Sequence, residues 1–176
     1  SDTDTRFYGH ISTQGGRLSG DGGFIELSSK DSLAYGGTVN QEAPQGSPGT
    51  FLFDPSDIIV RNGTDGSTPP APFTVLGVDP PNPGTLVIFE QTLENSTSNI
   101  ILQALRDITI EDLTDNALTL QSGVTIRFDV DSNTSGTGDF IMDDLNDAII
   151  APNGGIQITR GDDTMGPASF FNIGRL

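Results

Sequence analysis

The sequence predicts an all-β fold in which short strands coil as a parallel β-helix, or β-solenoid. Three observations predict it: short alternating apolar runs recur along the chain, no helical segment separates them, and the breaks between them are rich in glycine and polar residues. The chain has 176 residues with 22 glycines and 11 prolines, a composition that suits short strands joined by tight turns. This length fits one domain spanning residues 1–176.

The candidate strands are alternating or β-branched runs. They lie at residues 24–29, 50–54, 58–60, 85–91, 99–104, 107–112, 118–122, 124–130, 139–144, 155–160 and 169–173. Side chains two apart face the same way in a strand, so pairs such as Ile108 and Ile110 form one narrow apolar stripe. Such strands either pair as hairpins or stack on their counterparts one turn later. Breaks such as Arg106-Asp107 lack the Asn-Gly or Gly-Gly pair of hairpin turns, which favours solenoid corners.

Two segments interrupt the strand pattern. Residues 61–84 hold six of the eleven prolines. Proline has no backbone N–H for a β-ladder, so we interpret this stretch as an excursion from the coil. Residues 131–138, DSNTSGTG, form a second and smaller loop.

One pair of motifs resembles a known family. Residues 22–28 read GGFIELS and residues 49–55 read GTFLFDP. This pair is similar to coil segments of large two-partner-secreted exoproteins of the filamentous haemagglutinin type, especially cyanobacterial ones. The runs NIILQALRDITI and VTIRFDV resemble later coils of the same proteins, so the resemblance spans roughly residues 9–161. It implies a right-handed parallel β-helix, export to the cell surface or the extracellular space, and a role in adhesion or filaments without a catalytic site.

The charge of the chain excludes two classes of partner. The formal net charge is −16, which repels the phosphate backbone of nucleic acids and anionic lipid surfaces. No stretch is long and apolar enough for a membrane span, so we expect no membrane insertion. Cations are the natural small partners of such a chain.

An acidic loop is the candidate metal site. Oxygen donors at alternate positions suit a hard cation such as Ca²⁺, the one cofactor that the sequence suggests. The candidate ligands are Asp129, Asp131, Asn133, Ser135 and Asp139. The loop departs from the EF-hand pattern because Thr134 stands in place of the turn glycine and Phe140 in place of the bidentate glutamate. A solvated polar turn is the alternative interpretation.

The two ends of the chain are the candidate assembly surfaces. The end coils of a solenoid expose open strand edges and an apolar cross-section, and neither end here has the helical spacing of a capping helix. We therefore expect a secreted, non-enzymatic subunit that associates end to end with copies of itself or with adjacent coils of a longer exoprotein. The expected interface residues are Phe7, Tyr8, Ile11, Phe170, Phe171 and Ile173.

Two other functions compete with this interpretation. A monomeric adhesin module would present the 61–84 segment to glycans or to a receptor. A polysaccharide-active enzyme would gather acids from the pairs Asp143-Asp144 and Asp162-Asp163 in one cleft, as general acid and base. Parallel β-helices support several functions, so the fold does not choose among the three.

Overall fold

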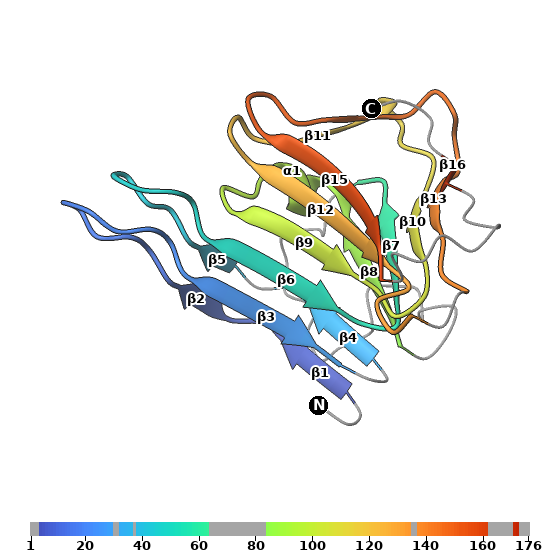
Figure 1. Ribbon diagram of the computed structural model, residues 1–176, viewed down its shortest axis with the longest axis horizontal. Coiled ribbons are helices and arrows are strands. Elements are labelled where there is room, and N and C mark those ends of the chain that lie inside the picture. Colours follow the sequence, from blue (N-terminus) through green and yellow to red (C-terminus); the bar gives the residue numbers. More distant parts are fainter. Residues whose placement is uncertain are drawn as a thin grey trace.

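The chain folds as a parallel β-solenoid of about five turns (Figure 1). The computed structural model describes residues 4–29, 32–36, 38–63, 84–134, 137–161 and 171–172. All strand pairs within these ranges are parallel. The predicted fold class is therefore confirmed, and the short breaks between strands are solenoid corners.

Two five-stranded sheets form the body of the solenoid. The first has the order β15-β12-β9-β6-β3 and the second the order β16-β13-β10-β7-β8. The strands of the first sheet are β3 (Phe24–Ser28), β6 (Thr50–Asp54), β9 (Asn99–Gln103), β12 (Thr125–Val130) and β15 (Gly155–Arg160). Those of the second are β7 (Asp57–Arg61), β8 (Thr85–Phe89), β10 (Ile108–Ile110), β13 (Phe140–Met142) and β16 (Phe171–Asn172).

Three two-stranded sheets complete the coils. Near the N-terminus, β1 (Asp4–Phe7) pairs with β4 (Ser32–Tyr35), and β2 (His10–Ser12) pairs with β5 (Thr38–Asn40). In the later coils, β11 (Ala117–Thr119) pairs with β14 (Ala148–Ile150). The sequence did not predict β1, β2, β4, β5 or β14, because these short segments (DTRF, HIS, SLAY, TVN and AII) show no clear alternation of apolar and polar residues.

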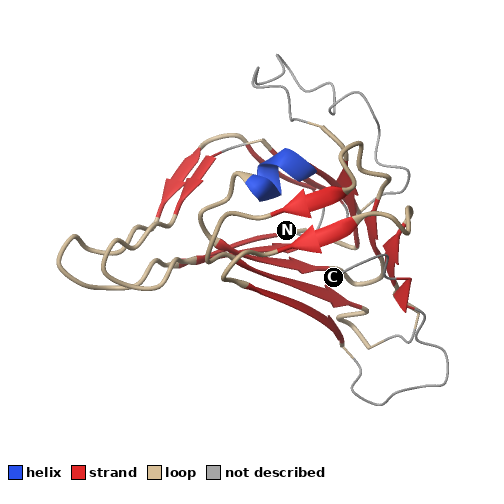
Figure 2. Ribbon diagram, turned by 90° about the horizontal axis from the view of Figure 1, so that it is seen from above, coloured by secondary structure: helices blue, strands red, loops and turns tan. Residues whose placement is uncertain are grey.

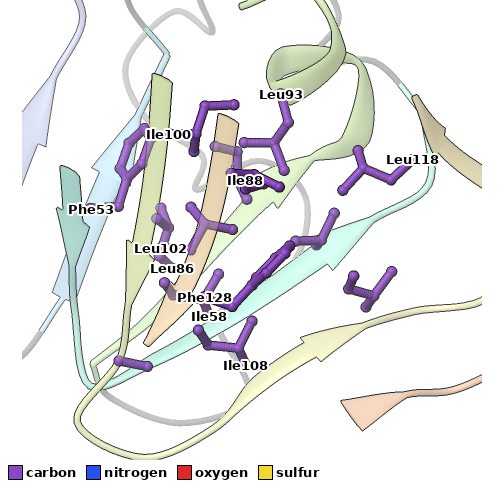
Figure 3. Close-up of a cluster of buried hydrophobic side chains, with 14 of the residues drawn as sticks. Phe53, Ile58, Leu86, Ile88, Leu93, Ile100, Leu102, Ile108, Leu118 and Phe128 are labelled. Carbon is purple, nitrogen blue, oxygen red and sulfur yellow. The ribbon is translucent and has the colours of Figure 1, made fainter. Parts of the chain in front are cut away.

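The core consists of apolar side chains that repeat in register from coil to coil. In the first sheet Phe53 aligns with Leu102, which in turn aligns with Phe128. Figure 3 shows these side chains together with residues of the second sheet, among them Ile58 and Ile108. The Phe128 ring meets the Phe140 ring of the second sheet edge to face, with centroids 4.9 Å apart, and both side chains are fully buried. The apolar residues of the alternating sequence pattern are thus the ones whose side chains lie on the inward face of each strand.

One coil is enlarged, and it contains the short helix α1 (Glu90–Glu94). Phe24 of β3 aligns with Thr50 of β6, and Ile100 of β9 aligns with Ile126 of β12, so these two coils use the same length of chain. Thr50 of β6, in contrast, aligns with Asn99 of β9, which lies much further along the chain. The extra residues include β8, which pairs with the side of β7 opposite to β10. Residues 64–83, most of the expected excursion, lie outside the described residues.

The candidate strand at residues 85–91 is wrong in its last two residues. The strand ends at Phe89, and α1 begins at Glu90. Leu93 points from this helix into the core, where it is almost fully buried (Figure 3). A helix of one turn shows no repeated 3.6-residue spacing, which is why the sequence did not reveal it.

The connections after β2 and β5 project side by side from the solenoid (Figures 1 and 2). We call residues 13–23 and 41–49 together the finger. A 2.9 Å bond from the Thr13 N–H to the Asn40 carbonyl and a 2.8 Å bond from the Gly15 N–H to the Glu42 carbonyl join the two segments. The glycine-rich stretch before β3 is therefore part of the finger. Its two segments pair with each other as successive coils do in the body of the solenoid.

Candidate functional site

The strand β3 is an edge of the first sheet. It pairs with β6 on one side, and no described strand pairs with its other side. The Gly23 carbonyl accepts the Thr50 N–H at 3.0 Å, so alternate residues from Gly23 onward direct their backbone groups toward β6. Phe24 and Glu26 therefore direct their N–H and C=O groups outward, where they offer hydrogen bonds to an added strand.

The strand β15 is the opposite edge of the same sheet. It pairs with β12 on one side, and within the described residues no strand pairs with its other side. Ile156 and Ile158 are only half-buried there, although the residues aligned with them in β12, Ile126 and Phe128, are fully buried. The final described coil thus leaves part of the apolar cross-section uncovered.

Exposed large apolar side chains gather in the end coils. Among the described residues these are Leu18, 94% exposed, and Phe24, 58% exposed, in the first coil, with Leu145, 62%, and Ile150, 43%, in the coil of β13 and β14. The coils between contribute none to this group.

The assembly residues expected at the N-terminal end lie on or beside β1 and β2. The Phe7 ring stacks on the Tyr35 ring of the next coil, with centroids 6.2 Å apart and planes within 10°. Ile11 packs half-buried against the core, and Tyr8 is half-buried between the two strands. Burial raises the pKa of the Tyr8 phenol. The strands β1 and β2 pair with β4 and β5 on one side only.

The assembly residues expected at the C-terminal end can be placed only in part. Phe171 belongs to β16, which pairs with β13. Phe170 and Ile173 lie outside the described residues. Their part in an interface stays a prediction.

The predicted calcium loop is placed at the end of β12. The carboxylates of Asp129 and Asp131 pair with arginines: Asp129 with Arg127 through a 2.8 Å bond from Nε, and Asp131 with Arg160 at 3.2 Å. The Asp139 N–H donates to the Asp107 carboxylate at 2.9 Å. Asn133 lies in the turn, and Ser135 is outside the described residues. The role of these residues as calcium ligands stays a prediction, and two of them already have cationic partners.

A second group of acids does come together. A carboxylate oxygen of Asp112, one of Asp144 and one of Asp147 all lie within 4.8 Å of one another. Asp112 follows β10, and the other two follow β13, which is paired with β10. The sequence marked Asp144 only as a neighbour of Asp143 in a candidate catalytic pair. The other candidate pair, Asp162-Asp163, lies outside the described residues. The signal that could have found the group is the repeat of ITIEDL at 108–113 in FIMDDL at 140–145.

An aromatic pocket of about 260 Å³ lies between α1 and the N-terminal coils. Tyr35, Phe51 and Phe53 line it, and the two phenylalanines contact the Tyr35 ring edge to face at 5.3 and 5.2 Å. Polar side chains of α1 and the residues after it, including Gln91 and Asn95, lie at the same pocket. The sequence did not predict this pocket because its walls come from five separate strands and the helix.

None of the helices in the described part of the chain is long and apolar enough to cross a membrane. Comparison with known proteins finds no family model, no curated protein and no solved structure that matches the chain.

Proposed function

We propose that the chain is a non-enzymatic structural segment of an extracellular filament or surface adhesin, which extends by adding further coils at its strand edges. The observation that supports this most is the combination of open edges at β3 and β15 with exposed apolar side chains in the same end coils. An open strand edge is a template for pairing with another strand, and exposed apolar side chains are costly to leave in water.

The two edges differ, so the expected contact is head to tail. β3 offers the outward backbone groups of Phe24 and Glu26, and β15 offers a partly covered apolar cross-section. A contact between two different surfaces that does not close into a ring produces a filament. The partner is a second copy of the chain or an adjacent coil of a longer exoprotein. The net charge of −16 would keep filaments apart laterally.

An extracellular location belongs to the same proposal. Its support is the resemblance of residues 22–28 and 49–55 to segments of secreted exoproteins. The chain has no cysteine, which fits this location without requiring it.

A proline substitution at the outer edge of β3 tests the proposal. Glu26 is exposed and its N–H points away from β6, so Glu26→Pro removes one donor for an added strand while leaving the β3–β6 ladder in place. Glu26→Ala is the matched control, since it makes the same loss of charge and keeps the N–H. We expect the wild-type chain and Glu26→Ala to form thin fibres in negative-stain electron microscopy, and Glu26→Pro to stay dispersed.

Sedimentation velocity on the same three samples gives the size distribution, and circular dichroism checks that each is folded. A wild-type chain that remains monomeric at all concentrations would contradict self-association. Fibres of normal length from a folded Glu26→Pro variant would contradict addition at the β3 edge.

The aromatic pocket favours a second candidate function, glycan binding by a monomer. Phe51 and Phe53 are almost fully buried beneath the pocket, so the partly exposed ring is Tyr35. An aromatic ring beside polar groups suits a sugar, which has an apolar face and a hydroxylated edge. Glycan-array binding by the monomeric chain that is lost in Tyr35→Ala would support it. Absence of binding by the wild-type chain would leave only the filament function.

A further inference from the structure

Two successive corners of the solenoid stack directly on each other. The first, residues 111–116, joins β10 to β11, and the second, residues 143–147, joins β13 to β14. Since β10 pairs with β13 and β11 with β14, the corners are held in register at both ends. The Asp143 N–H donates to the Ile110 carbonyl at 2.9 Å, which begins the second corner directly above the first.

Three carboxylates meet between these corners. The oxygens that Asp112, Asp144 and Asp147 offer lie within 4.8 Å of one another. Oxygens bound to one Ca²⁺ at about 2.3–2.6 Å are separated by at most about 5 Å. The three oxygens are therefore close enough to bind a single ion without rearrangement of the corners.

The carboxylate of Asp147 is buried, and one of its two oxygens has no hydrogen-bond partner. Its side chain is 0% exposed, and Oδ2 accepts the Leu113 N–H at 3.1 Å. Its Oδ1 is buried and makes no hydrogen bond. A buried carboxylate oxygen without a partner is costly, and burial together with the nearby Asp144 raises the pKa of Asp147. A cation beside Oδ1 would remove this cost.

Among the described residues, no ion pair involves Asp112, Asp144 or Asp147. The ion pairs among described residues involve other acids, and the nearest in sequence joins Arg61 to Glu111 at 2.6 Å. A further acid increases the negative potential: Glu90 of α1 is buried, and only its Oε1 accepts a hydrogen bond, from the Gly63 N–H at 2.8 Å. Burial raises the pKa of Glu90, and the charge of Asp147 contributes to this rise, so the two carboxyl groups interact electrostatically.

We propose that Asp112, Asp144 and Asp147 bind one Ca²⁺ ion, which links two successive coils of the solenoid. The donors are all hard carboxylate oxygens, which suit Ca²⁺. Zinc fits this group less well, because the group includes no histidine or cysteine, the usual ligands of protein zinc sites. Asp112 is exposed and provides the entry for the ion and for the water molecules that complete its coordination.

The ion would act as a clamp between coils. Asp144 Oδ1 already accepts the Asn146 N–H and side-chain amide at 2.9 Å, so the second corner is preorganised around its own ligands. Asp112 is the ligand from the other coil, so binding ties the two coils together. Binding to the folded state alone raises stability with free Ca²⁺ concentration.

Calorimetric titration of Ca²⁺ into the chelator-treated chain tests the site. We compare wild type with Asp112→Asn, Asp147→Asn and the control Asp143→Asn, which removes the same charge from an exposed neighbour outside the triad. We expect a loss of affinity of at least about tenfold in the first two variants, since even changes behind a metal ligand cost that much. Asp143→Asn should bind like wild type, and Mg²⁺ should compete poorly because it requires a tighter octahedral site.

Thermal unfolding with and without Ca²⁺ is the second measurement. Ca²⁺ should raise the Tm of wild type and Asp143→Asn and leave the Tm of Asp112→Asn nearly unchanged. Because Asp112 is exposed, its variant should fold even if Asp147→Asn does not. The site is overturned if wild type binds no Ca²⁺ at millimolar concentration, if Asp112→Asn binds as tightly as wild type, or if Asp139→Asn alone abolishes binding. These outcomes are independent of whether the chain forms fibres.

Discussion

The Gln41 side chain is bonded to the Gly23 carbonyl of the preceding coil. Gln41 Nε2 donates to this oxygen at 2.7 Å and to the Thr50 carbonyl at 2.9 Å. The side chain is fully buried where the finger joins the body, and its Oε1 has no hydrogen-bond partner. One amide thus connects two coils at the base of the projection.

We expect Gln41→Leu to lower the free energy of unfolding by about 1–3 kcal/mol. The substitution keeps the approximate shape of the side chain and removes its two part-buried hydrogen bonds, each of which contributes about 0.5–1.5 kcal/mol. Urea unfolding followed by circular dichroism measures the change. Gln14→Leu is the matched control, because Gln14 is exposed in the same finger and should have little effect. Equal stability of Gln41→Leu and wild type would show that the bridge contributes nothing.

Gly22→Ala should destabilise the base of the finger more than an ordinary glycine-to-alanine change. A Cβ at Gly22 would overlap the Gln41 carbonyl oxygen and the Gly49 backbone nitrogen, and backbone atoms cannot move aside cheaply. At Gly155 a Cβ would meet only Thr125 side-chain atoms at 3.6 Å, which is ordinary contact, so Gly155→Ala is the control. We expect a loss of about 1–3 kcal/mol for Gly22→Ala, as for overpacking in a core. Similar melting temperatures for both variants would contradict the close approach.

Stability should fall as pH rises through the raised pKa of Asp54. Burial raises the pKa of this carboxyl above 3.8, with a further contribution from Glu26. The native state therefore binds the proton more tightly than the unfolded state. The resulting stabilisation is complete below pH 3.8 and is lost as pH rises through the higher native pKa.

Asp54→Asn tests this dependence by thermal unfolding at about pH 4 and about pH 7. The variant does not titrate, so its Tm should change less between these pH values and should exceed that of wild type at the higher one. Asp143→Asn controls for the general repulsion in an acidic chain, since its carboxylate is exposed. The prediction fails if the two variants respond to pH identically.

The sequence by itself determined the fold class and the positions of the longer strands. β3, β6, β9, β12 and β15 match runs that alternate apolar and polar residues, because in a strand the inward side chains recur every second position. The parallel corners were also predictable, since the breaks lack the residues that hairpin turns require.

Only the tertiary structure decided which distant residues meet. In the Asp112–Asp144–Asp147 group, Asp112 is separated from the other two acids by a full turn of the solenoid, so only the register between coils brings the three together. The aromatic pocket depends on α1, which is too short for a helical pattern, and on β8, which returns to the far side of β7. The periodicity of a strand can be recognised from neighbouring residues. The register between coils depends instead on the length of chain in each turn, and the turn between β6 and β9 is enlarged.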